Sequence, residues 1–79
     1  LKMQNELAYH DVYSVAYADL KGIPIRMIRE DRRVIFLLPD EPNTYQVLGE
    51  FNSNPSLPLL NYITHLKKIR AQMIALQRA

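Results

Sequence analysis

Residues 23–39 read IPIRMIREDRRVIFLLP, a run of β-branched, aromatic and long aliphatic side chains that is interrupted once by charged residues. Such side chains favour extended strands, and apolar residues at every second position are typical of a pleated surface. Asp31 and Arg32 lie between the two apolar halves, which predicts a β-hairpin with these two residues as its turn. In that register Glu30 faces Arg33, although a longer loop from Glu30 to Arg33 would also fit the sequence.

The predicted hairpin has one apolar face and one mixed face, because side chains alternate along a strand. We expect the first face to contact the core. It carries Ile25, Met27, Arg29, Val34, Phe36 and Leu38. The second face carries Arg26, Ile28, Glu30, Arg33, Ile35 and Leu37. The second face is too apolar to meet water alone, so we expect a partner chain to cover Ile28, Ile35 and Leu37.

One helix is predicted before the hairpin. Asp11 can accept hydrogen bonds from its first turn, and apolar residues recur at helical spacing from Val12 to Lys21. Gly22 stands where a left-handed C-terminal cap is favoured. We expect residues 1–10 to be irregular or disordered.

Two helices are predicted after the hairpin. Thr44 can cap a short helix that ends at Phe51, and Ser56 can cap a long final helix with Pro58 in its first turn. The final helix carries the strongest periodic signal of the chain, and we expect it to pack across the hairpin. Its apolar stripe consists of Leu59, Tyr62, Leu66, Ile69, Met73 and Leu76.

The element order α-β-β-α-α predicts a small α+β domain over residues 1–79, with a hairpin packed against helices and a long C-terminal helix. A chain of 79 residues has a small core, and without cysteine it has neither a disulfide nor a thiolate metal site. A two-stranded sheet is marginal alone. We therefore expect a homodimer, formed by hairpins meeting edge to edge or through Met73 and Leu76. The alternative is a monomer in which Leu7 or residues 52–57 supply a third strand.

Four arginines lie within eight residues of the hairpin, and no acidic residue follows Glu50. Guanidinium groups bind phosphates and stack on bases, and basic helices contact backbone phosphates. We therefore expect a non-catalytic, dimeric nucleic-acid-binding protein that uses the hairpin and the final helix. Its candidate contact residues are Arg26, Arg29, Arg32, Arg33, Lys67, Lys68 and Arg70.

Two alternatives stay open. Glu30 and Asp31 stand inside the arginine cluster and can pair with Arg33 and Arg32, which would leave a solvated hairpin tip. The basic flank of the final helix can equally be a solubilising face opposite the apolar stripe. The chain would then be a protein-protein interaction or adaptor module with no nucleic-acid role.

Several chemistries lack their usual residues in this sequence. The two histidines, His10 and His65, have no partner at zinc-ligand spacing, the three serines stand in no nucleophile motif, and two isolated glycines make no phosphate-binding loop. We expect no catalytic residue, metal site, cofactor or small-molecule substrate. The apolar runs are only a few residues long, so we expect no membrane segment. Absence of cysteine suits a reducing compartment, and we expect a cytoplasmic protein.

One combination of motifs extends from the first predicted helix to the last. It consists of Asp11-Val12-Tyr13, Ala16-Tyr17, Gly22, an alternating strand with a charged turn, Val34-Ile35-Phe36 and Leu66-Lys67-Lys68. This combination covers most of residues 11–69. It resembles a family of short, functionally uncharacterised proteins from bacteria and their phages. The resemblance implies no activity, ligand or functional residue.

Overall fold

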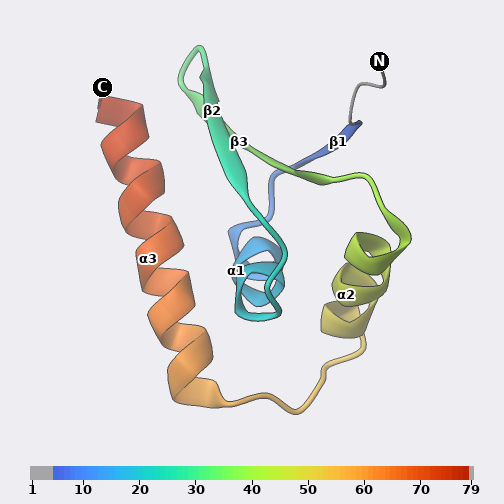
Figure 1. The fold of residues 1–79 in the computed structure, drawn as a ribbon. Coiled ribbons are helices and arrows are strands. Elements are labelled where there is room, and N and C mark those ends of the chain that lie inside the picture. The colour runs from blue at the N-terminus through green and yellow to red at the C-terminus, as the bar shows by residue number, and fades with distance from the viewer. Residues whose placement is uncertain (1–4, 79) are drawn as a thin grey trace.

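The structure, a computed structural model of the chain, describes residues 5–78. Its elements are β1 (Glu6–Tyr9), α1 (Val12–Leu20), β2 (Arg26–Glu30), β3 (Arg33–Pro39), α2 (Pro42–Asn52) and α3 (Leu59–Arg78). The described strands form one antiparallel sheet in the order β1-β3-β2, so β3 is central. The helices lie on one side of this sheet (Figure 1). The α+β class, the hairpin and the long C-terminal helix are confirmed.

The hairpin of β2 and β3 has the register that its sequence predicts. Glu30 pairs with Arg33, so Asp31 and Arg32 alone form the turn. Asp31 has a φ of 58°, in the left-handed region. Aspartate tolerates that region better than most residues, because its short polar side chain can bond locally to the backbone. It therefore supplies a conformation for which tight hairpin turns usually use glycine.

Residues 6–9 form a third strand, where the sequence predicts an irregular segment. β1 pairs with β3, which places Leu7 opposite Leu38 and Tyr9 opposite Phe36. Both β1 side chains pack against the core. Burial of these two side chains and closure of one edge of β3 compensate for the conformational entropy that residues 6–9 lose when they form a strand. This arrangement is the alternative in which Leu7 supplies a third strand. Of the segment predicted to be irregular, residues 1–4 lie outside the described residues.

The core lies between the inner sheet face and the helices. Residues 14–18 of α1 are all buried, because α1 packs against both other helices and its side chains join those of β3 in the core cluster. Phe36, Leu38 and Ile69 are at most 1% exposed and pack in the same cluster. The final helix contacts both strands of the hairpin, as the sequence predicts, but it packs mainly against α1.

Two of the three predicted helix starts shift in the structure. The Asp11 cap is confirmed: its carboxylate accepts a hydrogen bond from the Tyr13 N–H at 3.1 Å. Thr44 does not cap α2, which begins at Pro42, and Thr44 lies buried within the first turn. α3 begins at Leu59, because a proline at position 58 disfavours the helical conformation in the residue before it.

The two glycines give a pair of predictions with opposite signs. We expect Gly49→Ala to raise the free energy of unfolding by about 0.5–1 kcal/mol, and Gly22→Ala to lower it by about 1 kcal/mol. An added Cβ meets no atom within 4 Å at either position, so the backbone conformation at each glycine determines the sign of the stability change. Gly49 lies inside α2, whereas Gly22 has a φ of 87°. Urea unfolding followed by circular dichroism measures both; changes of the same sign would contradict this explanation.

Candidate functional site

The face of the sheet that points away from the helices brings together the apolar residues that the sequence assigns to a partner. Ile28 lies directly opposite Ile35 across β2 and β3, and Leu37 follows on β3. All three are partly exposed, and none of them packs in the core cluster. We call this surface the outer sheet face. By strand register it consists of Glu6, Ala8, Arg26, Ile28, Glu30, Arg33, Ile35, Leu37 and Pro39.

The four hairpin arginines do not form one surface. Arg26 and Arg33 belong to the outer sheet face, Arg29 points to the opposite face by register, and Arg32 lies in the turn. The Nε of Arg29 donates a hydrogen bond to the carbonyl oxygen of Asp31 at 2.9 Å. Alternation of side chains along the strands therefore separates groups that stand close together in the sequence.

Arg26 is held by a carboxylate from another strand. Its Nη2 lies 2.7 Å from Oε1 of Glu6, and its Nε donates to Oε2 of Glu6 at 3.2 Å. The hydrogen bond to Arg26 is the main cause that lowers the pKa of Glu6, and the same bond raises the pKa of Arg26. This fork-like pair crosses over β3 on the outer sheet face, so Arg26 is less available to an external phosphate than its sequence suggests.

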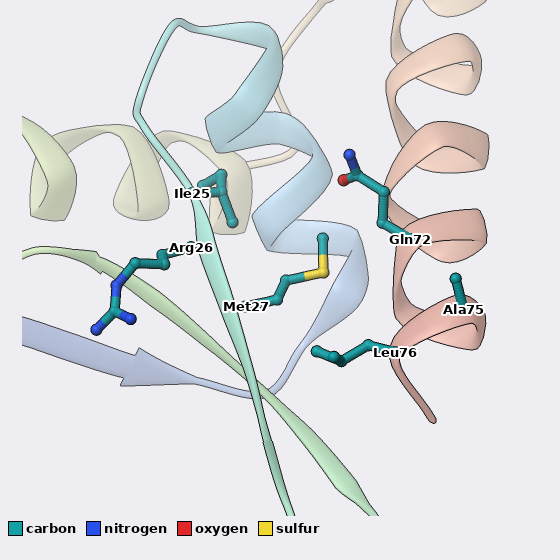
Figure 2. Close-up of a pocket in the computed structure, with 6 residues that line it drawn as sticks. All are labelled: Ile25, Arg26, Met27, Gln72, Ala75 and Leu76. Carbon is teal, nitrogen blue, oxygen red and sulfur yellow. The ribbon is translucent and has the colours of Figure 1, made fainter. Parts of the chain in front are cut away.

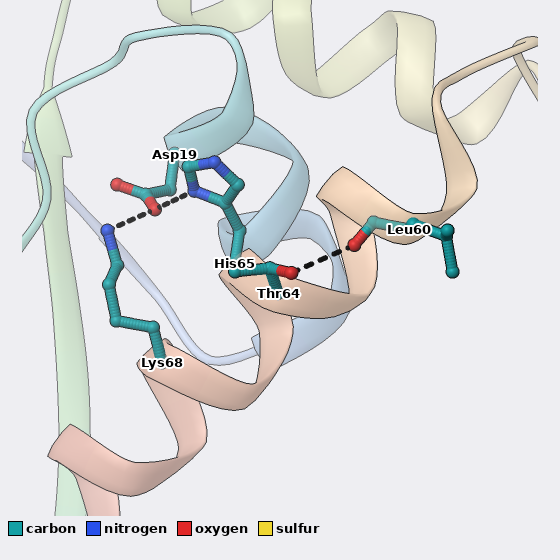
Figure 3. A network of polar contacts seen from close by, with 5 residues as sticks. All are labelled: Asp19, Leu60, Thr64, His65 and Lys68. Carbon is teal, nitrogen blue, oxygen red and sulfur yellow. Dashed lines mark hydrogen bonds and ion pairs between the residues drawn. The ribbon is translucent and has the colours of Figure 1, made fainter.

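Two of the basic residues predicted on α3 are bound to α1. The Nζ of Lys68 lies 2.7 Å from Oδ2 of Asp19, and Nδ1 of His65 lies 2.5 Å from the same oxygen (Figure 3). Arg70 stacks over the Tyr13 ring at 5.5 Å and donates to its hydroxyl oxygen at 3.0 Å. These contacts attach α3 to α1 near both ends of α1. His65 is thus a structural contact of α1 as well as a partly exposed residue.

Burial raises the pKa of Asp19, but hydrogen bonds from His65 and Lys68 outweigh burial and lower it overall. The ionised carboxylate therefore stabilises the fold at neutral pH, and this contribution disappears as pH falls through the lowered pKa. We expect Asp19→Asn to lower the free energy of unfolding by about 1–2 kcal/mol at pH 7 and to make it less dependent on pH below about 5. Urea unfolding at pH 7 and at about pH 3 measures both effects.

The matched control for Asp19→Asn is Glu6→Gln, which removes the exposed carboxylate of the other ion pair. We expect a much smaller change at pH 7, because exposed pairs are screened by solvent. Equal losses of unfolding free energy in the two variants would show that the contacts of Asp19 with α3 stabilise the fold no more than an exposed ion pair does.

The remaining predicted residues differ in their environment. Lys67 is exposed on α3, and Arg32 and Arg33 are exposed at the tip of the hairpin. Met73 and Leu76, which the sequence offers to a partner, are partly buried and pack against the core of their own chain.

A groove that the sequence analysis does not identify runs between β2 and the last turns of α3 (Figure 2). It is open to solvent, has a volume of about 560 Å³ and is mainly apolar. Met27 and Leu76 lie on its two sides. The inward position of Met27 and the apolar stripe of α3 are the sequence signals for its walls, but only the packing of α3 beside β2 creates the groove. Its lining consists of Ile25, Arg26, Met27, Gln72, Ala75 and Leu76.

Within residues 5–78, no three histidine, aspartate or glutamate side chains stand close enough together to hold a metal ion. No helix in this part of the chain has the length and apolar character needed to cross a bilayer. No family model, curated protein or solved structure matches this chain. The resemblance to short bacterial and phage proteins therefore stays a prediction.

Proposed function

We propose that this protein is a small non-catalytic interaction domain that binds another protein through its outer sheet face. One observation carries the proposal: by strand register Ile28, Ile35 and Leu37 lie together on the face of the sheet opposite the core, and all three are partly exposed. A cluster of β-branched and aliphatic side chains on a sheet gains hydrophobic free energy when a second surface covers it.

The surroundings of this cluster suit a protein partner. The outer sheet face places the Glu6–Arg26 pair across the end of the sheet away from the turn, and the exposed Glu30 and Arg33 beside the turn. Protein interfaces commonly have an apolar centre with a polar rim. Charges of both signs in the rim favour a partner of mixed charge over a polyanion.

The proposal is tested with peptides selected from a random phage-displayed library on the immobilised chain. We expect binding of the selected peptides to fall at least tenfold in Ile35→Glu, because a charge in the centre of an apolar contact must be desolvated. Leu60→Glu is the matched control, since Leu60 is 77% exposed on α3 and outside the outer sheet face. The proposal fails if the library gives no binders, or if the binders ignore Ile35→Glu.

Nucleic-acid binding is the second candidate function, and a specific observation favours it. Among the described residues, Arg32, Arg33 and Lys67 are exposed and have no ion-pair partner, and the hairpin tip projects beyond the helical layer (Figure 1). Exposed cations of this kind bind backbone phosphates with a strong dependence on salt.

Fluorescence anisotropy with labelled single-stranded and duplex oligonucleotides at low salt tests this candidate. We expect Arg32→Ala with Arg33→Ala to weaken binding roughly tenfold, because each cation lost removes a phosphate contact. Lys68→Ala is the matched control, since Asp19 already holds that ammonium group. No binding at low salt, or equal losses in the two variants, would exclude this surface.

A further inference from the structure

We propose that two copies of this chain pair antiparallel along the free edge of β1, centred on Ala8, and so form a continuous six-stranded sheet. The inference goes beyond the proposed function, because this edge is separate from the apolar centre of the outer sheet face. Three features carry it: outward backbone groups along β1, a small exposed residue at its middle, and a charge pattern that complements itself.

β1 has a neighbouring strand on one side only. In the order β1-β3-β2, no strand within residues 5–78 lies beyond β1. β3 is also the element that β1 mainly contacts. An edge strand of this kind offers its free N–H and C=O groups as a template for a strand of another chain.

The direction of the backbone groups of β1 follows from two observations near its start. The Asp40 N–H donates to the carbonyl oxygen of Asn5 at 3.1 Å, which makes these two residues a hydrogen-bonded position of the ladder with β3. Pro39, which has no N–H to donate, stands opposite Glu6. Hydrogen-bonded positions alternate along an antiparallel ladder, so Glu6 is a position that does not bond to β3.

The same alternation continues through β1. Leu7 and Tyr9 direct their N–H and C=O groups to β3, whereas Glu6 and Ala8 direct theirs to the free edge. Within residues 5–78 no other segment forms a hydrogen bond with the backbone groups of Ala8. Ala8 is exposed and its side chain ends at Cβ, so a copy of itself fits directly opposite.

Antiparallel pairing centred on Ala8 satisfies these outward groups. Ala8 then forms a hydrogen-bonded pair with Ala8 of the second copy, and Glu6 stands opposite His10 of the second copy. Two-fold symmetry repeats the Glu6–His10 contact. Both side chains are exposed, and an imidazole N–H donates to a carboxylate. The pair therefore complements itself without any change in the chain.

On the core side of the sheet, this register places Leu7 opposite Tyr9 of the second copy. Both side chains are partly buried and pack against the core of their own chain. Cross-strand pairs of aromatic and aliphatic side chains stabilise antiparallel sheets. The join between the two copies therefore covers apolar surface that each copy leaves partly exposed.

The neighbouring registers satisfy the same backbone groups but are less favourable. A register centred on Glu6 places two glutamates opposite each other, and like charges destabilise strand pairing. A register centred on Leu7 places Glu6 opposite Ala8, without a basic group. A register centred on Tyr9 places Glu6 opposite Val12, where β1 has ended and α1 has begun. The charge pattern and the length of β1 therefore select the register centred on Ala8.

Glu6 keeps its contact with Arg26 in this dimer. Both oxygens of its carboxylate accept a hydrogen bond from Arg26, but two carboxylate oxygens have about four acceptor positions. His10 of the second copy uses one of the remaining positions. The join between the two sheets is then crossed on each side by a row of Arg26, Glu6 and His10 of the second copy.

Sedimentation equilibrium tests the inference with a proline substitution. The 9.2 kDa chain is expected to reach twice this mass between micromolar and hundred-micromolar concentrations. Ala8→Pro removes an N–H that bonds to the second copy but not to β3, and proline is tolerated at such edge positions. We expect it to weaken the dimer at least roughly tenfold. Ala8→Ser is the matched control, because it keeps the N–H and should keep wild-type affinity.

A charge exchange tests the pairing of Glu6 with His10. His10→Glu places two carboxylates opposite Glu6 in the homodimer, and Glu6→Lys places two lysines opposite His10. We expect each variant alone to dimerise roughly tenfold more weakly than the wild type. In an equimolar mixture every such contact is again between groups of opposite sign or between carboxylate and imidazole, so a heterodimer of wild-type affinity should form.

A single introduced thiol reports the register directly, because the chain has no cysteine. Ala8→Cys places two thiols on Cα atoms about 5.5 Å apart, within the range of about 4.4–6.8 Å that a disulfide spans. Asn5→Cys leaves the Glu6–His10 contacts intact and places its two thiols six residues apart along the strands, about 20 Å. With oxidised glutathione as the oxidant, we expect Ala8→Cys to cross-link at least roughly tenfold faster.

Circular dichroism and urea unfolding establish that each variant is folded; if Ala8→Pro is not, His10→Glu and its rescue by the mixture replace it. A monomeric wild type at hundred-micromolar concentration overturns the inference. A dimer that either folded variant leaves intact overturns it as well, and so do equal rates of cross-linking for Ala8→Cys and Asn5→Cys. These experiments leave Ile35 unchanged, so failure of the dimer and failure of the peptide-binding test are separable.

Discussion

Phe36→Ala is expected to lower the free energy of unfolding by about 3–5 kcal/mol, because Phe36 is 1% exposed on the central strand of the sheet. Met27 and Tyr9 flank it on the neighbouring strands, and all three side chains face the helices. Truncation leaves a cavity at the point where the layers meet. The free energy of unfolding of a native protein is only about 5–15 kcal/mol, so the substitution removes a large part of the stability. Urea unfolding followed by circular dichroism measures the loss.

The control is Ile35→Ala on the same strand and the opposite face, where we expect a loss of about 1 kcal/mol or less. Ile35 is partly exposed and does not pack in the core cluster. A shift of one residue in the register would exchange the two positions. Equal losses at Phe36 and Ile35, or a larger loss at Ile35, would therefore contradict the register of β3.

The hairpin could be predicted from the sequence because its signals are local. A charged pair between two alternating apolar runs leaves few places for the turn, and the turn then fixes which residues share a face. The cap of α1 is also local: the carboxylate of Asp11 reaches the N–H of Tyr13 and the hydroxyl of Ser14 within one turn. Signals of this kind need no knowledge of the rest of the chain.

β1 could not be predicted with the same certainty. Four residues are too few for a clear period, and the segment becomes a strand because the edge of β3 and the core beneath it are open to Leu7 and Tyr9. The start of α2 was predicted wrongly: the sequence indicates Thr44 as the cap, but α2 begins at Pro42, a residue that is favoured in the first turn of a helix. Thr44 is buried instead of capping the helix, and burial is a tertiary property.

The candidate site was only partly predictable for the same reason. The apolar residues of the outer sheet face follow from alternation once the hairpin is known. The availability of a cation does not, because it depends on carboxylates that are distant in the sequence: Glu6 binds Arg26, and Asp19 binds Lys68. A count of arginines and lysines therefore overestimates the surface offered to phosphate.

The double substitution Leu7→Ala with Tyr9→Ala is expected to lower the free energy of unfolding by about 3–5 kcal/mol, although both residues lie in a four-residue edge strand. Each side chain is partly buried and packs against the core from β1. Without them β1 retains only its backbone hydrogen bonds, and these do not hold a short edge strand against its conformational entropy. The edge of β3 then opens, which also exposes Leu38.

Hydrogen exchange of the β3 amides, together with urea unfolding, measures this effect, because detachment of β1 exposes the amides of β3 that bond to it. Ala8→Ser is the matched control: Ala8 lies between the two positions but points to the outer sheet face and is exposed, so we expect almost no change. If the double variant unfolds at the same urea concentration as Ala8→Ser, β1 is not part of the cooperative fold, and the sheet reduces to the two-stranded hairpin that the sequence alone suggests.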